Sequence, residues 1–218
     1  MQRTTIEHLS NEIFREIFDY LLFQDINKSF FGITSNIDSI IRSMNSGSLE
    51  VSKTDINSEN LLSSFPTQIG RLVLNSCETV NFTSLINLRS LTIRFGSAVQ
   101  FDLISPKYFP LLEILHIGSD KSEHIRRLFE RILSNGFPRL RICTTIGINA
   151  IERSETWTGS PALRTLILNL RTLSDCEYIR SLCPNLRHFK GILESPNMPT
   201  GKILYLFAGK IYICLSSK

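Results

Sequence analysis

The sequence contains no CxxC pair, and its cysteines follow no recognisable spacing. There are five of them, an odd number: Cys77, Cys143, Cys176, Cys183 and Cys214. This pattern argues against a disulfide framework and against a zinc site, both of which need regularly spaced ligands or pairs. We therefore interpret the cysteines as small apolar core residues of a reduced compartment.

Long apolar runs and a strong charge of one sign are missing too. No segment approaches the ~20 apolar residues that span a bilayer, and the best candidate, 203–215, is interrupted by Gly209 and Lys210. The opening residues carry charges throughout, unlike a signal peptide. The formal net charge of +4 is modest and spread along the chain. We expect an intracellular protein, cytoplasmic and/or nuclear, without membrane or nucleic-acid partners.

The common catalytic motifs HExxH, GxSxG, GxGxxG and the P-loop are absent from the sequence. We therefore predict that the protein is not an enzyme and needs no cofactor and no metal. One alternative hypothesis is a hydrolase that uses Cys183 and His188, and it predicts an exposed, thiol-reactive Cys183. One basic group is interpreted as a solvated helix face rather than a nucleic-acid site: Arg126, Arg127, Arg131, Arg139 and Arg141.

The N-terminal segment has the pattern of three short helices. The first is expected over 10–22 with Ser10 as its N-cap, and the second opens at Asp25. The third begins near Ser35 or Asn36, with Ser35 and Asp38 in capping-box-like spacing. The apolar residues of the first helix cover an arc of roughly 200°, whereas packing on one neighbour needs little more than about 100°. Three short helices cannot bury that much surface among themselves.

The run LSNEIFREIFDYLLFQDINKSFFGITSNIDSII resembles the F-box, and the resemblance covers about residues 6–44. The matching positions are Leu9, Glu12, Ile13, Ile17, Phe18, Leu21, Asp25 and Ile26. Two features depart from the family pattern: Ser10 stands where the family usually has proline, and the third helix lacks the usual tryptophan. The resemblance implies that the helices bind the Skp-type adaptor of cullin-RING ubiquitin ligases through Leu9, Ile13, Ile17, Phe18, Leu21, Asp25 and Ile26.

Beyond residue 60, short apolar strands recur at intervals. The segment IGRLVLNSC, with Ile69, Leu72, Leu74 and Cys77, matches the leucine-rich-repeat consensus LxxLxLxxN/C. Related segments begin at 88, 112, 140, 163 and 186, and proline stands two residues before the last four of these starts. Helical patterns return between the strands. The chain therefore resembles leucine-rich-repeat proteins, in which stacked units form a curved solenoid.

Alternation along the predicted strands also indicates a binding face. Because Leu72 and Leu74 should point inward, the residues between them should point to the open face of the solenoid. That face mixes polar and apolar side chains, which suits protein recognition. The candidate substrate-binding residues are Arg71, Asn75, Arg94, His116, Asn169 and Lys190.

Together these patterns predict an α/β chain: an N-terminal three-helix F-box-like module (1–48), a linker (49–64), a short, irregular leucine-rich-repeat horseshoe (65–200) and a C-terminal cap or tail (201–218). The resemblances imply a substrate-recognition adaptor of an SCF-type ubiquitin ligase, which joins a protein substrate to the Skp-type adaptor and the cullin scaffold. The alternative is a leucine-rich-repeat scaffold or inhibitor protein whose helices only cap the solenoid and which has no role in ubiquitination.

Overall fold

The computed structural model describes most of the 218-residue chain. The described residues are 6, 9–52, 56–75, 81–118, 123–145, 154–170, 172–193, 202–207 and 210–215. Within them the chain forms seven α-helices and nine β-strands. The predicted α/β class is confirmed in this coarse form. Cys77 and residues 146–153 lie outside the described residues.

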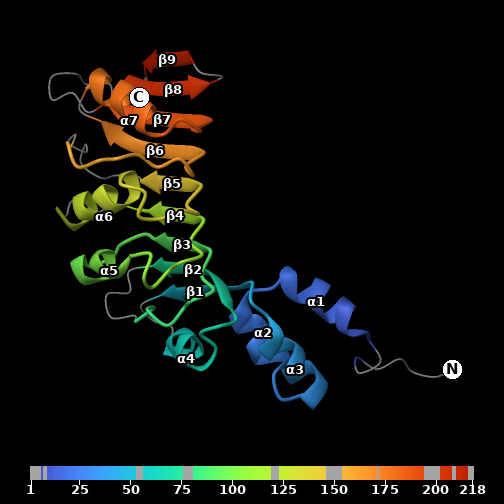
Figure 1. Cartoon of the computed structure of the whole chain (residues 1–218). Coiled ribbons are helices and arrows are strands. Elements are labelled where there is room, and N and C mark those ends of the chain that lie inside the picture. Colours follow the sequence, from blue (N-terminus) through green and yellow to red (C-terminus); the bar gives the residue numbers. More distant parts are fainter. Residues whose placement is uncertain are drawn as a thin grey trace.

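One sheet runs through the molecule, and its strands lie side by side in chain order (Figure 1). Neighbours from β1 to β7 pair in parallel, whereas β8 and β9 are antiparallel to the strands before them. Strands β2 to β7 coincide with the six predicted repeat starts. The bounds are β1 (Gly47–Ser52), β2 (Ile69–Asn75), β3 (Ser90–Ile93), β4 (Ile114–Ile117), β5 (Ile142–Thr145), β6 (Thr165–Leu170), β7 (His188–Leu193), β8 (Lys202–Phe207) and β9 (Lys210–Leu215).

Helices carry the chain from one parallel strand to the next on one side of the sheet: α4 (Ile56–Ser64), α5 (Ala98–Leu103), α6 (Glu123–Leu133) and α7 (Leu173–Leu182) (Figure 1). The core lies between these helices and the sheet. Alternate strand residues point into it, as Leu72 and Leu74 were predicted to do, and both are buried. The same alternation recurs in β3, β4 and β5. Leucine spacing with period two therefore sets which face of each strand is inside.

The three predicted N-terminal helices are present: α1 (Asn11–Asp19), α2 (Phe23–Phe30) and α3 (Ser35–Ser43). α3 begins at Ser35, as predicted, whereas α2 begins at Phe23 and not at Asp25. Thr34, not Ser35, caps α3 by accepting the Ile37 N–H at 3.2 Å. Leu22, not Asp25, precedes α2. The backbone of Leu22 is extended and forms a single parallel bridge to Ser48 of β1. Asp25 lies instead in the first turn, where a carboxylate favours the helix dipole.

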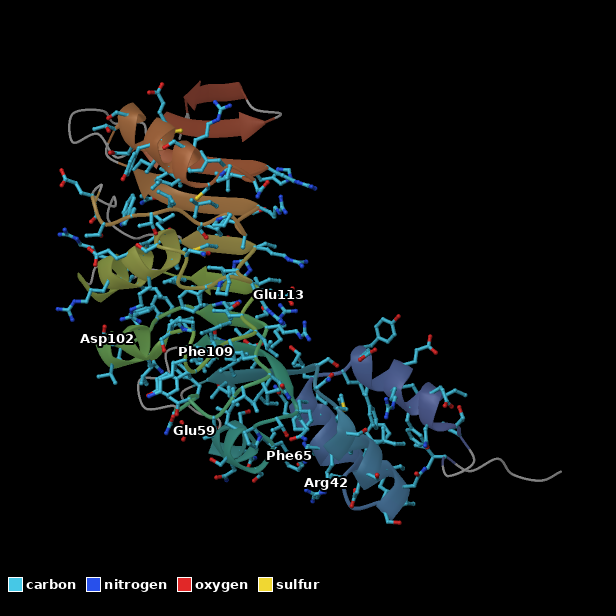
Figure 2. The ribbon with its side chains drawn as sticks, viewed as in Figure 1. Arg42, Glu59, Phe65, Asp102, Phe109 and Glu113 are labelled. Carbon is cyan, nitrogen blue, oxygen red and sulfur yellow. The ribbon has the colours of Figure 1, made fainter. Side chains whose placement is uncertain are left out.

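Residues 49–64, expected to be a linker, contain most of β1 and all of α4. Phe65, directly after α4, joins this part of the sheet to the helices: its ring lies 5.4 Å from the rings of both Phe23 and Phe31 in edge contacts. The Arg42 guanidinium lies over the same Phe65 ring at 5.7 Å (Figure 2). The Gln68 side chain adds a hydrogen bond to the Arg42 carbonyl at 2.6 Å. The helices are therefore packed on the first end of the sheet.

Among the described residues, no helix is both long enough and apolar enough to cross a lipid bilayer.

Candidate functional site

Helix α1 has two apolar faces, and only one of them is used inside the protein. Phe14 and Phe18 are buried, with ring centroids 5.9 Å apart, and the Phe18 ring makes an edge contact with Phe30 at 5.1 Å. Polar contacts hold the helix against α3: Arg15 donates to the Ser43 hydroxyl at 3.2 Å. This face accounts for the attachment of α1 to the rest of the chain.

The second face of α1 is open to solvent. Ile13, Ile17 and Tyr20, which we name the α1 stripe, are 44%, 37% and 85% exposed. Their spacing of four and then three residues places them on one side of the helix. At about 100° per residue, the centre of this stripe lies about 110° from the Phe14 and Phe18 face. The helix therefore presents an ordered row of large apolar side chains that the protein covers only in part.

The predicted adaptor-binding residues divide into three groups. Ile13 and Ile17 lie on the α1 stripe, and Leu9 and Leu21 flank it partly buried against the core. Asp25 is exposed on α2. Phe18 and Ile26 are buried completely, which corrects their assignment to a partner surface. Both belong to the core cluster of buried side chains.

Sequence reasoning missed Tyr20 as a site residue, although a signal for it existed. Tyr20 follows Ile13 by seven residues, so two helical turns bring it onto the same side. It is the most exposed of the large hydrophobic residues in the described part of the chain. Tyrosine is enriched among the residues that dominate protein interfaces, because its ring supplies apolar area and its hydroxyl a hydrogen bond.

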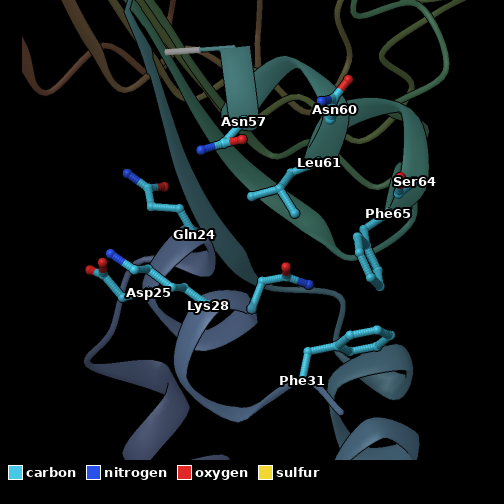
Figure 3. A pocket seen from close by; sticks show the side chains of 10 residues that line it. Gln24, Asp25, Lys28, Phe31, Asn57, Asn60, Leu61, Ser64 and Phe65 are labelled. Atoms are coloured by element: carbon cyan, nitrogen blue, oxygen red, sulfur yellow. The ribbon is translucent and has the colours of Figure 1, made fainter.

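A polar cleft of about 640 Å³ lies between α2 and α4 (Figure 3). Its apolar part is formed by Phe31, Leu61 and Phe65, and Asp25 and Lys28 line it from α2. Amide side chains complete the lining: Gln24, Asn27, Asn57 and Asn60. Amides both donate and accept hydrogen bonds, so this cleft suits a polar backbone or side chain of a partner. Asp25, assigned by resemblance to adaptor binding, therefore borders a different surface from the α1 stripe.

The open face of the sheet carries most of the predicted substrate-binding residues. Strand pairing brings Val73, Thr92, His116, Thr144, Ile167 and Lys190 into one row across six strands. Arg71 and Arg94 are exposed beside this row, and Asn75 is half-buried and donates to the Glu50 carboxylate. Asn169 is only 7% exposed, so it offers almost no surface to a partner. Five of the six predicted residues, all except Asn169, are thus at least partly accessible on this face.

His116 is the only titratable residue of this face with a shifted pKa among the residues described. Burial lowers the pKa of His116, and the positive charge of Arg71 lowers it further. The imidazole is therefore neutral at physiological pH, and it can both donate and accept a hydrogen bond.

The five arginines considered for nucleic acid do not form one patch. On α6, Arg126 pairs with Glu130 at 3.6 Å, and Arg131 pairs with Asp102 at 3.6 Å and also donates to the Ile104 carbonyl at 2.6 Å. Arg139 and Arg141 line a separate surface where β5 begins. Arg126 and Arg131 of α6 are therefore engaged in local ion pairs.

A nucleophilic role for Cys183 conflicts with its surroundings. Cys183 is buried, and burial raises the pKa of its thiol to about 11. Burial, reinforced by the nearby Cys183, raises the pKa of Cys143 to about 12. A thiol of this kind is protonated at neutral pH and is a poor nucleophile. Within the described ranges no group of three or more His, Cys, Asp or Glu side chains could hold a metal ion.

Comparison of the chain with protein-family models, with curated proteins and with solved structures finds no match. The resemblance to the F-box and to leucine-rich repeats therefore rests on the residues quoted above, and function has to be argued from the surfaces of this chain.

Proposed function

We propose that this chain is the substrate-recognition adaptor of an SCF-type cullin-RING ubiquitin ligase. Its N-terminal helices act as an F-box-like module that binds the Skp-type adaptor and, through it, the cullin scaffold. The strands act as a short leucine-rich-repeat horseshoe that binds a protein substrate. The chain contributes binding surfaces and no catalytic residue.

The α1 stripe is the observation that carries this proposal. Ile13 and Ile17 were singled out by the F-box pattern, and both remain open to solvent while Phe14 and Phe18 complete the core. Had Ile13 and Ile17 been buried against the strands, nothing would be left for an adaptor to cover. A helix with a second, unoccupied apolar face is instead what helix-in-groove recognition by another protein requires.

Magnitudes show that the α1 stripe needs neighbours to make a stable complex. Complete burial of Ile13, Ile17 and Tyr20 at ~1.5–3 kcal/mol each would contribute roughly 5–9 kcal/mol, and the isoleucines already hide more than half of their surface. Association costs about 4–15 kcal/mol in lost freedom. The partly buried Leu9 and Leu21 and the exposed Leu22 extend the surface at both ends of the helix. The interface therefore has to include them.

The position of α1 fits a protein that joins two partners. In Figure 1, α1 lies beyond β1 at one end of the sheet, whereas β4 to β7 lie toward the other end. A partner on the α1 stripe would leave His116 on β4 and Lys190 on β7 accessible. Two partners can therefore bind without competing for the same residues.

A scaffold or inhibitor without a role in ubiquitination is the second candidate. It is favoured by the packing of α2 and α3 on the first end of the sheet through Phe23, Phe31 and Phe65. That packing covers the end of a stack, as a capping element does. The capping residues are different from the α1 stripe, so capping alone leaves Ile13, Ile17 and Tyr20 unexplained.

Co-purification of the full chain with a Skp-type adaptor tests the proposal. We expect a stable complex with the unaltered chain, and at least a 30-fold loss of affinity in Ile17→Asp, since a buried charge in an interface centre costs 2 kcal/mol or more. Calorimetry of the purified partners measures both values. Circular dichroism checks that the variant stays folded.

Asp19→Ala is the matched control, because Asp19 is exposed on the same helix but lies about 120° from the α1 stripe. Its affinity should equal that of the unaltered chain. A chain that ignores the adaptor, or an Ile17→Asp variant that binds as well as the control, would contradict the proposal and leave the scaffold as the better reading.

A further inference from the structure

A charged residue stands directly before each of five consecutive strands, and in four of the five it is an arginine. Directly before β3, β4, β5, β6 and β7 stand Arg89, Glu113, Arg141, Arg164 and Arg187. Each follows the leucine that begins its repeat segment, and those leucines point into the core. Because side chains alternate along extended chain, the next residue is directed outward.

Backbone hydrogen bonds bring these five positions together. The N–H groups of Glu113, Arg141, Arg164 and Arg187 each donate to the carbonyl of the preceding member at 2.8 Å. Neighbouring members are therefore separated by about one strand spacing, ~4.8 Å. We name this row the arginine ladder. Residues more than twenty positions apart in sequence become adjacent only through this pairing.

The ladder lines one cleft of about 920 Å³, to which Arg139 also contributes. We name it the arginine cleft. The one carboxylate in its lining is Glu113, which pairs with Arg89 at 2.8 Å and lies 4.0 Å from Arg141. Five arginines against one glutamate leave an excess of four positive charges in the lining of this cleft.

Within the described part of the chain, the arginines farther from Glu113 have no counter-ion. Among the described residues, no carboxylate lies within ion-pair distance of Arg139, Arg164 or Arg187. Arg139 and Arg187 are exposed, and Arg164 is half-buried. The positive charges of arginines on neighbouring strands repel one another, so a bound anion would relieve this repulsion. Guanidinium groups also bind carboxylates and phosphates with paired hydrogen bonds.

We propose that the arginine cleft binds an extended acidic segment of a partner protein. From Arg141 to Arg187 the ladder spans about 9.6 Å, which is close to three residues of extended chain at ~3.3 Å each. Two anionic side chains two or three residues apart would therefore reach two members of the ladder. The anionic oxygens belong either to Asp and Glu carboxylates or to phosphorylated side chains, which share this chemistry.

The lining favours a peptide over single-stranded nucleic acid. Binding of single strands combines a basic groove with aromatic side chains on which bases stack. The uncharged side chains of this cleft are Pro138 and Ala162, and His188 is its one ring of aromatic character. These small side chains leave room for a peptide backbone but offer little stacking surface.

Fluorescence anisotropy with the full-length chain and labelled peptides tests the proposal. The probes are a peptide with two Asp residues, the same peptide with two phosphoserines, and the same peptide with two Asn residues. We expect both acidic peptides to bind and the Asn peptide to bind at least tenfold more weakly. Equal affinity of the acidic peptides would identify carboxylates as the ligands, whereas a clear preference for phosphoserine would identify a phosphorylated segment.

Arg187→Gln should weaken acidic-peptide binding about tenfold or more, because a hydrogen bond to a charged group is lost. Arg187→Lys, which keeps the charge but loses the paired geometry, should fall between the two. Arg127→Gln on α6 is the matched control, since it removes an exposed arginine outside the cleft. Thermal unfolding confirms that each variant is folded.

Three outcomes would overturn the proposal: no binding of either acidic peptide, the same loss in Arg127→Gln as in Arg187→Gln, or tighter binding of a single-stranded RNA oligonucleotide than of both peptides. The identity of the segment as a ligase substrate rests on the proposed function. The peptide assay omits the Skp-type adaptor, so the failure of one proposal is distinguishable from the failure of the other.

Discussion

The helical end of the molecule and the edge where its strands begin expose opposite chemistries. The α1 stripe presents isoleucine and tyrosine, whose burial is non-directional and depends little on salt. The arginine cleft presents guanidinium groups, whose interactions depend on geometry and are screened by salt. The α1 stripe therefore suits a partner bound through apolar contact area. The arginine cleft suits a partner recognised through its negative charge.

In both surfaces, the buried residues determine which neighbouring residues are exposed. In α1 the large rings of Phe14 and Phe18 fill the interior, and the residues rotated away from them are left outside. Along the ladder each buried leucine forces the following residue outward. The core thus determines where each exposed group lies, and the type of residue then determines which partner it can bind.

The largest expected effect comes from breaking the junction between the two regions. Phe65→Ala removes the ring that contacts Phe23 and Phe31 and lies beneath Arg42. We expect a loss of about 3–5 kcal/mol in the free energy of unfolding, as for other buried phenylalanines. Chemical denaturation followed by circular dichroism measures this loss.

Phe95→Ala is the control for this change, because the Phe95 ring is exposed. It should alter the stability of the protein little. If Phe65→Ala lowered the free energy of unfolding as little as Phe95→Ala, contacts other than those of Phe65 would join the helices to the sheet.

A smaller effect is expected from removing the one carboxylate in the lining of the arginine cleft. Glu113→Gln leaves Arg89 and Arg141 without their shared partner, which should raise acidic-peptide affinity several-fold through reduced competition. Stability should change by less than about 1 kcal/mol, since these are exposed ion pairs. Anisotropy and thermal unfolding measure the two quantities.

Glu130→Gln provides the comparison, because it removes a glutamate that pairs with Arg126 on α6, outside the cleft. It should leave peptide affinity unchanged. A gain of affinity in both variants would indicate a general charge effect rather than a local one at the cleft.

The smallest expected effect is on the pH dependence of stability, to which β4 of the sheet and helix α1 contribute in different pH ranges. Burial lowers the pKa of His116, so the unfolded chain binds a proton more readily, and stability should fall as the pH drops below 6.5. Hydrogen bonds from its own backbone N–H and from Ser10 lower the pKa of Glu12 on α1, so its contribution is lost only as the pH falls below 4.5.

His116→Gln should remove the loss that begins below pH 6.5 while leaving the acid limb below 4.5 unchanged, and Glu12→Gln should do the reverse. Melting temperatures measured across this pH range separate the two. An unchanged profile in His116→Gln would show that burial of the imidazole does not contribute to stability.

The repeat pattern predicted the strands well because their physics is local. Leu72 and Leu74, or Leu166 and Leu168, are buried and alternate with a residue that is only half-buried, and a strand buried on one face requires that alternation. β1 was not predicted. It has two inward apolar residues, Leu49 and Val51, and its pairing with β2 depends on the helices and Phe65 around it. The domain boundaries and the horseshoe remain predictions.

The sequence by itself determined that α1 has more apolar surface than one neighbour can cover, and that arginine follows leucine in repeat after repeat. Only the tertiary structure decided that Phe14 and Phe18 go inside while Ile13, Ile17 and Tyr20 stay outside, because that choice depends on how the apolar side chains of three helices pack together. It also decided that distant arginines share one cleft, because hydrogen bonds between strands, and not proximity along the chain, set which residues become neighbours.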